Sequence, residues 1–81
     1  MNVTVRFFAR ARDLTGTPSE TFDLAEGATV LDLRRRLAAN YPALESLLAR
    51  SALAVNDEFA DDDQHLQNDA EVALLPPVSG G

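Results

Sequence analysis

The chain has 81 residues, a net charge of −6, no cysteine and one histidine. A chain of this length forms one small domain with one modest core, and the lack of cysteine excludes disulfides, thiolate metal sites and a catalytic thiol. Its acidic balance disfavours nucleic acid and anionic membranes as partners and favours proteins with basic surfaces.

No apolar run approaches the ~18 to 20 residues that span a bilayer, and the N-terminus lacks a signal pattern. We therefore expect a soluble, cytoplasmic protein. The lone His65 cannot form a metal site by itself, and we expect the chain to bind neither a metal ion nor a cofactor. All seven basic residues are arginine, so any conjugation must use the C-terminus of this chain and not a side-chain amine.

The N-terminal segment alternates apolar and polar residues, which is the period-two pattern of a half-buried strand. The apolar members, expected to face the core, are Val3, Val5, Phe7, Ala9 and Ala11. Residues 13–18 form a turn cluster in which Gly16 is available for a positive φ. Alternation resumes from Glu20 to Leu24, and we predict a hairpin of two strands joined by a short loop.

The period changes after Gly27, because apolar residues then recur at three and four residues along one helical face. These residues are Val30, Leu33, Leu37 and Tyr41. Thr29 is the predicted N-cap with Asp32 at the third helical position, a variant of the capping box. Asn40 and Pro42 end the predicted helix.

Two runs of charged residues are expected to be solvated. The arginines at 34–36 point largely away from the apolar stripe of the helix, and Asp32 is expected to pair with Arg36 across one turn. The acidic residues 61–63 lack the spacing and the glycine of a calcium loop. We therefore predict a solvated loop there and no cation site.

Short elements follow the helix. The leucines at 44, 47 and 48 predict a helical turn that covers the open end of the core. Residues 52–55 and 58–59 form a predicted hairpin across the turn at Asn56 and Asp57. A second turn at 67–70 places Asn68 in the left-handed region, and the last strand, 71–75, leads into a proline pair.

This order of elements predicts an α+β fold, in which one main helix packs on one face of a mixed sheet of four to five strands. The expected core residues are Val3, Val5, Phe7, Phe22, Leu24, Val30, Leu33, Leu37, Leu53, Val55, Val72 and Leu74. On the opposite face of the sheet the same alternation predicts an apolar patch rimmed by guanidinium groups, which is a composition typical of interfaces. Its expected members are Phe8, Phe59, Leu75, Arg6, Arg10 and Arg12.

The chain ends in a proline pair followed by Val78, Ser79, Gly80 and Gly81. Glycine carries no Cβ and tolerates any backbone angle, so the last two residues fit a channel too narrow for a side chain. The prolines at 76 and 77 have a fixed φ, which limits the conformations that the tail loses on insertion. The pattern predicts a tail that presents its α-carboxylate at a reacting centre.

Four segments carry a resemblance: VRFFARARDLTG near the N-terminus, TVLDLRRRLA at the helix, AVN at 54–56, and the ending EVALLPPVSGG. Together they resemble the small subunit of molybdopterin synthase, a ubiquitin-like sulfur carrier. The resemblance covers nearly the whole chain, and PPVSGG and FFARARDLTG are its most specific parts. It implies a single ubiquitin-like β-grasp domain over residues 1–81, with 76–81 as a flexible C-terminal tail.

The resemblance implies chemistry at Gly81. An E1-like activating enzyme, which uses ATP and magnesium, adenylates the Gly81 carboxylate, and a sulfur donor then converts it to a thiocarboxylate. In a heterotetramer of two small and two large subunits, the tail enters the large subunit and gives its sulfur to cyclic pyranopterin monophosphate. The small subunit itself is a non-catalytic carrier.

By the same resemblance, partner-binding residues follow from the family. Phe8, Arg12, Phe59 and Leu75 match positions that contact the large subunit or the activating enzyme. The remaining partner-binding positions are those of the tail, Pro76, Pro77, Val78 and Ser79, with Gly80 next to the reactive Gly81.

Three other functions stay open. The chain is alternatively a sulfur carrier for thiazole, tungsten cofactor or another sulfur pathway, a ubiquitin-like modifier joined through Gly81 to lysines of other proteins, or a β-grasp interaction module without tail chemistry. The FFARARDLTG segment favours the molybdopterin carrier over thiazole carriers, which usually lack it. It does not separate the carrier from archaeal modifiers that share this segment and the tail.

Overall fold

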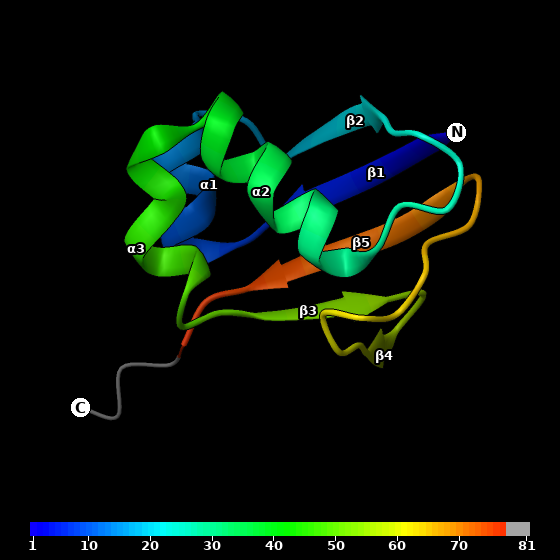
Figure 1. Cartoon of the computed structure of the whole chain (residues 1–81). Helices are drawn as coiled ribbons and strands as arrows, with labels where there is room; N and C mark the ends of the chain where they lie inside the picture. Colours follow the sequence, from blue (N-terminus) through cyan, green and yellow to red (C-terminus); the bar gives the residue numbers. More distant parts are fainter. Residues whose placement is uncertain (78–81) are drawn as a thin grey trace.

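The computed structural model describes residues 1–77 and forms one five-stranded sheet covered on one face by helices (Figure 1). In chain order the elements are β1 (Asn2–Phe7), α1 (Ala9–Thr15), β2 (Ser19–Asp23), α2 (Val30–Asn40), the 3-10 turn η1 (Pro42–Leu44), α3 (Glu45–Leu48), β3 (Ala52–Val55), β4 (Glu58–Phe59) and β5 (Ala70–Leu75). The predicted α+β architecture, with α2 as the main helix on the sheet, is confirmed.

The sheet is mixed, with the strand order β2-β1-β5-β3-β4. The first and last strands, β1 and β5, run parallel at its centre, so that Phe7 pairs with Leu74. The neighbouring pairs, β1 with β2 and β3 with β5, are antiparallel. Because β1 and β5 end side by side, the C-terminal tail leaves the sheet next to the point where α1 begins.

The predicted strand from Val3 to Ala11 is wrong beyond Phe7. Ala9 has a φ of 49°, which turns the backbone out of the strand, and Ala9–Thr15 form α1. Ala9 is therefore exposed, although Ala11 is buried as expected. The segment fits a helix as well as a strand, because Ala11 and the half-buried Leu14 are three residues apart and can lie on one face of a helix.

Two predictions about turns differ in outcome. Gly16 takes a φ of 74° as the C-cap of α1, and its N–H donates to the Arg12 carbonyl at 2.9 Å, as is typical of glycine at this position. Asn68 was the expected left-handed residue of the last turn, but the positive φ falls on Asp69 at 64°. The Asn68 side chain instead accepts a hydrogen bond from the Asn2 N–H at 2.8 Å.

The core lies between the sheet and the helices, and all twelve residues predicted for it are buried. Further apolar residues complete it, namely Ala11, Ala28, Leu44, Leu47, Leu48, Leu66 and Ala70. The three leucines come from η1 and α3 and cover the open end of the core, as the sequence predicted; the structure shows that the tail leaves from this end.

The start of α2 has the predicted capping box. The Thr29 hydroxyl accepts from the Asp32 N–H at 3.3 Å, and the Asp32 carboxylate accepts from the Thr29 N–H at 2.9 Å. The hydrogen bonds from the Thr29 backbone and hydroxyl lower the pKa of Asp32 below its ordinary value. Within residues 1–77 no ion pair joins Asp32 to Arg36, because the cap already holds the Asp32 carboxylate.

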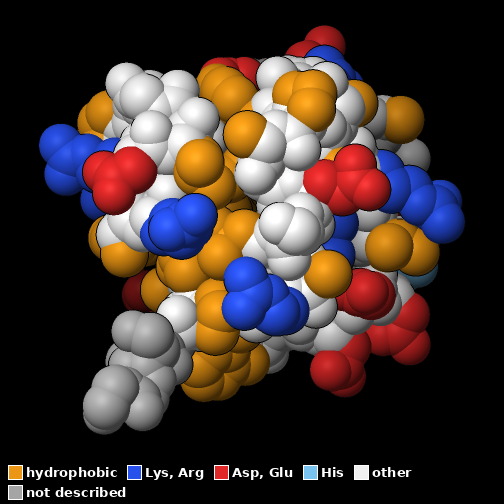
Figure 2. Space-filling model, turned by 90° about the vertical axis from the view of Figure 1, so that its left-hand side faces the viewer, with side chains coloured by type: hydrophobic (Ala, Val, Ile, Leu, Met, Phe, Trp, Pro, Cys, Tyr) orange, Lys and Arg blue, Asp and Glu red, His pale blue; other side chains and the backbone are white. Residues whose placement is uncertain are grey.

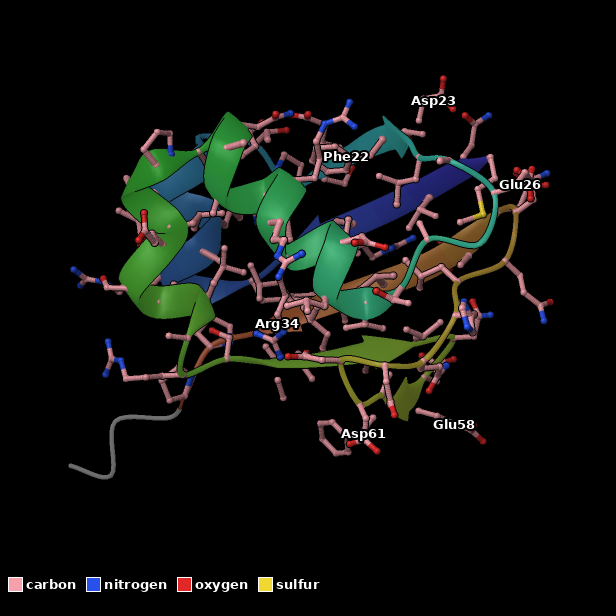
Figure 3. The ribbon with its side chains drawn as sticks, in the orientation of Figure 1. Phe22, Asp23, Glu26, Arg34, Glu58 and Asp61 are labelled. Carbon is pink, nitrogen blue, oxygen red and sulfur yellow. The ribbon has the colours of Figure 1, made fainter. Side chains whose placement is uncertain are left out.

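Arg34 is not part of a solvated face. Its guanidinium donates to the carbonyls of Leu48 at 2.6 Å and Ser51 at 3.0 Å, and it pairs with Asp62 at 2.8 Å. Figure 3 shows Arg34 between α2 and β3. Since two carbonyls and a carboxylate share one guanidinium, this side chain joins α2 to the end of α3 and to the acidic loop.

We expect Asp32→Asn to change how stability depends on pH. The folded-state pKa of Asp32 is lowered, so its carboxylate stabilises the fold above the unfolded-state pKa, and this stabilisation is lost as the pH falls through the folded-state pKa, below about 4. The Asn variant lacks that component. Urea unfolding between neutral and acidic pH measures the difference, with Asp63→Asn as control; identical pH profiles for wild type and Asp32→Asn would contradict it.

Candidate functional site

The outer face of the sheet, opposite the helices, carries an apolar patch. Strand pairing puts Arg6, Ala73, Ala54 and Phe59 in one row across four strands. The next row, toward the tail, holds Ala52 paired with Leu75. We call the apolar members of this face the outer patch, which consists of Phe8, Ala52, Ala54, Phe59, Ala73 and Leu75.

The structure brings together three of the predicted partner-binding residues on the outer patch. Phe59 is 77% exposed and Phe8 44% exposed, while Leu75 is half-buried. Large apolar side chains left in water on one face are typical of protein-binding surfaces. The prediction missed Ala54, which is itself buried on this face, and the half-buried Ala73, although period-two alternation in 52–55 and 71–75 already places both opposite the core residues.

A shallow hollow of about 330 Å³ lies at the centre of the outer patch. Phe8, Ala54 and Ala73 form its apolar part. Arg6, Asp57 and Glu71 form its polar rim, and Arg6 pairs with Glu71 at 3.3 Å. Both are exposed, so this pair contributes little to stability, about 0 to 1 kcal/mol, and its groups are available to a partner.

Arg10 and Arg12 do not rim this patch as the alternation predicted. Because the strand ends at Phe7, both lie on α1, and neither lines the central hollow. Arg12 is exposed as expected. Arg10 lines a different groove, which is formed with Leu14 of α1, residues of η1 and α3, and the proline pair.

The tail begins where β5 ends. Pro76 is half-buried and Pro77 is exposed, and both line the groove that also contains Arg10 and Arg50. Figure 2 views this end of the molecule and shows basic side chains on both sides of an apolar strip near the start of the grey residues. Val78, Ser79, Gly80 and Gly81, which include the predicted reactive residue, lie outside the described residues.

Tyr41 supports this end of the sheet. Its hydroxyl donates a hydrogen bond to the Glu20 carboxylate of β2, and its ring meets Phe7 edge-on, with centroids 5.8 Å apart. The hydrogen bond to Glu20 and burial raise the pKa of the Tyr41 hydroxyl, since both favour the protonated form. The contact holds β2 and the end of α2 against the end of β1, from which Phe8 leaves the sheet.

The described part of the chain offers no obvious place for a resident cation. Residues 1–77 contain no group of three or more acidic or histidine side chains arranged to hold a metal ion. In the acidic run 61–63, the Asp62 carboxylate forms an ion pair with Arg34, and the Asp61 carbonyl accepts a hydrogen bond from the Gln64 N–H at 3.1 Å. Among the same residues, no helix is long and apolar enough to cross a membrane.

Sequence comparison gives one family over nearly the full length. The model of the ThiS family matches residues 5–81. The molybdopterin synthase sulfur carrier subunit of Chlamydomonas reinhardtii is 37% identical over 83 residues, covering all of both chains. That of Arabidopsis thaliana is also 37% identical, covering 100% of this chain and 84% of the relative.

Structure comparison gives the same fold in carriers and modifiers. SAMP1 from Haloferax volcanii, a small archaeal modifier protein, has a TM-score of 0.90 at 30% identity. A chain in the complex of subunits 1 and 2 of molybdopterin-converting factor from Helicobacter pylori has 0.73 at 28%, and both matches cover 100% of the two chains. A ubiquitin from Caldiarchaeum subterraneum has a TM-score of 0.67 at 16% identity, covering 100% of this chain and 98% of that one. The predicted ubiquitin-like β-grasp fold is confirmed.

Proposed function

The chain belongs to the ThiS family and to the molybdopterin synthase sulfur carrier subunits, and we propose that Gly81 carries the sulfur as a C-terminal thiocarboxylate. The observation that carries this proposal is the match over residues 5–81, which includes the diglycine ending. The side chains of this chain supply neither a thiol nor a lysine amine. Because no side-chain thiol is present to carry sulfur, the proposal places the sulfur on the terminal carboxylate.

Activation precedes sulfur transfer in the proposed sequence. The Gly81 carboxylate attacks ATP on an E1-like enzyme, and pyrophosphate leaves as the acyl-adenylate forms with magnesium bound to the nucleotide. A donor then supplies sulfur at the oxidation level of sulfide, which attacks the acyl carbon and displaces AMP, giving the thiocarboxylate. A free carboxylate is a poor electrophile, so adenylation creates the leaving group that this exchange needs.

The thiocarboxylate is the nucleophile of the second stage. It remains ionised near neutral pH and, as soft sulfur, attacks a carbon of cyclic pyranopterin monophosphate in the large synthase subunit, where the new C–S bond replaces a C–O bond and the oxygen is the leaving group. Water then cleaves the acyl–sulfur bond, which leaves sulfur on the pterin and returns the Gly81 carboxylate. Two such transfers supply the two sulfurs of the dithiolene.

The tail has the reach that this scheme requires. Four extended residues, 78–81, span at most about 14 Å beyond the prolines. Pro77 is exposed at the end of the described chain, so the tail starts from the surface and not from within the core. The fixed φ of the two prolines reduces the conformational entropy lost when the tail enters a channel.

The outer patch is the proposed docking surface for the partner that receives the tail. Phe8 and Leu75 lie next to the tail root, and Phe59 lies on the same face on the edge strand β4; all three offer apolar contact, and Arg12 offers a charge from α1. The complex of subunits 1 and 2 in Helicobacter pylori supports the large subunit as partner. We propose the same pairing here, within an assembly of two small and two large subunits.

The proposal is tested by loading and transfer. Incubation with the cognate activating enzyme, ATP, magnesium and a sulfur donor is expected to raise the mass of the intact chain by the replacement of one oxygen by sulfur. The loaded chain should then convert cyclic pyranopterin monophosphate when the large subunit is added. Deletion of Gly81 is the control, and a mass shift that survives this deletion would rule out the assignment.

A protein modifier is the second candidate, favoured by the similarity to SAMP1. In that case activated Gly81 joins lysine amines of other proteins. Tryptic peptides that carry the C-terminal remnant of this chain on lysine would identify the modifier function. Such peptides should be absent when Gly81 is deleted.

A further inference from the structure

A groove of about 360 Å³ beside the tail root is basic and partly apolar. Arg10 of α1 and Arg50, which follows α3, stand among its lining residues, and Leu14 and Leu47 contribute apolar surface. Among residues 1–77, no acidic residue lines it. Asp13 and Glu45 lie on α1 and α3, but neither belongs to this groove.

The two guanidinium groups have no counter-charge within residues 1–77. Arg6 pairs with Glu71 and Arg34 with Asp62, while neither Arg10 nor Arg50 makes a side-chain hydrogen bond or ion pair there. Both are exposed. Arginine presents a planar fork of donors that matches a carboxylate, so the groove is suited to an anionic side chain.

The groove is basic although the chain as a whole is acidic. Strand pairing puts Asp23, at the end of β2, at the opposite end of the sheet from Pro76, while Glu58 of β4 pairs with Val55, which is opposite Val72 in the middle of β5. Figure 3 shows Asp23, Glu26 and Glu58 away from the tail. An acidic partner surface is therefore repelled from that end and attracted to the groove.

Pro76 and Pro77 connect the groove to the tail. They line the groove and directly precede the four residues that, under the proposed function, enter the large subunit. The rim of that subunit's channel must then pass over Arg10 and Arg50. We propose that Arg10 and Arg50 form a docking clamp for an acidic side chain on this rim, separate from the outer patch; this inference rests on the proposed function.

The test is binding of the full chain, unloaded, to the large subunit by calorimetry at several salt concentrations. The double variant that carries both Arg10→Glu and Arg50→Glu is expected to bind at least about tenfold more weakly and with a smaller salt dependence. Arg10→Glu and Arg50→Glu are also measured singly, and Arg35→Glu is the matched control for one charge reversal, because Arg35 is an exposed arginine of α2 outside the groove. It should change the affinity little.

Equal losses for the single groove variants and for Arg35→Glu would overturn the clamp, since they would reflect net charge alone. A loss confined to loading by the activating enzyme would also overturn it, because the groove would then serve another partner. Circular dichroism checks that each variant is folded, and Arg10→Lys with Arg50→Lys should recover much of the affinity. Failure of the wild-type chain to be loaded with sulfur at Gly81 would instead refute the proposed function. The intact mass of the chain after incubation with the activating enzyme detects that failure independently of binding.

Discussion

Phe59→Asp is expected to weaken binding to the large subunit by about thirtyfold or more, the effect of an interface residue that contributes about 2 kcal/mol or more. Phe59 is 77% exposed and lies on the edge strand β4. Its ring therefore contributes little to folding and is available to a partner. An aspartate there replaces apolar contact with a carboxylate that must lose its water on docking.

The matched control is Phe59→Leu, which keeps an apolar side chain at the same place and should retain most of the affinity. Titration calorimetry gives the affinity, and thermal unfolding shows whether the fold is unchanged. Unaltered binding by folded Phe59→Asp would exclude Phe59 from the interface. Leu75→Asp is a poorer test, because Leu75 is half-buried and its replacement also perturbs β5.

Leu33→Ala is expected to lower the free energy of unfolding by about 2 to 5 kcal/mol. Leu33 is 0% exposed and belongs to the core face of α2, so its removal leaves a cavity. Small domains are stable by only about 5 to 15 kcal/mol, and this loss is therefore a large share of the total.

Leu31→Ala provides the comparison on the same helix. Leu31 is only half-buried, and its shortening should cost clearly less. Urea unfolding of both variants at one pH measures the difference. Equal destabilisation by the two changes would show that α2 packs on the sheet through a different face.

The helix α2 was predictable because its signals are local. Its apolar stripe and the capping box of Thr29 and Asp32 are encoded within a few residues, and both appear as expected. The alternation of inward and outward side chains predicted for the strands also placed Phe8 and Leu75 outside the core. Such patterns depend on the geometry of one element and need no knowledge of its neighbours.

The errors arose where two local patterns competed. The segment after Phe7 alternates like a strand, yet Ala9 turns the chain and α1 follows. The choice depends on the space that η1 and α3 leave beside the sheet, which no short segment reveals. Arg34 is a similar case, because its partners Leu48 and Ser51 come from a later part of the chain.

The sequence by itself determined the family, the β-grasp fold and the diglycine ending at which we place the chemistry, since these depend on residue identity and short-range periodicity. The tertiary structure alone decided that β1 and β5 run in parallel and that α1 and α3 border the tail root. It thereby brought Arg10 and Arg50 to one groove beside Pro76 and Pro77. Residues so far apart along the chain become neighbours only when the whole core packs, because burial of the shared apolar surface, and not any local preference, sets their positions.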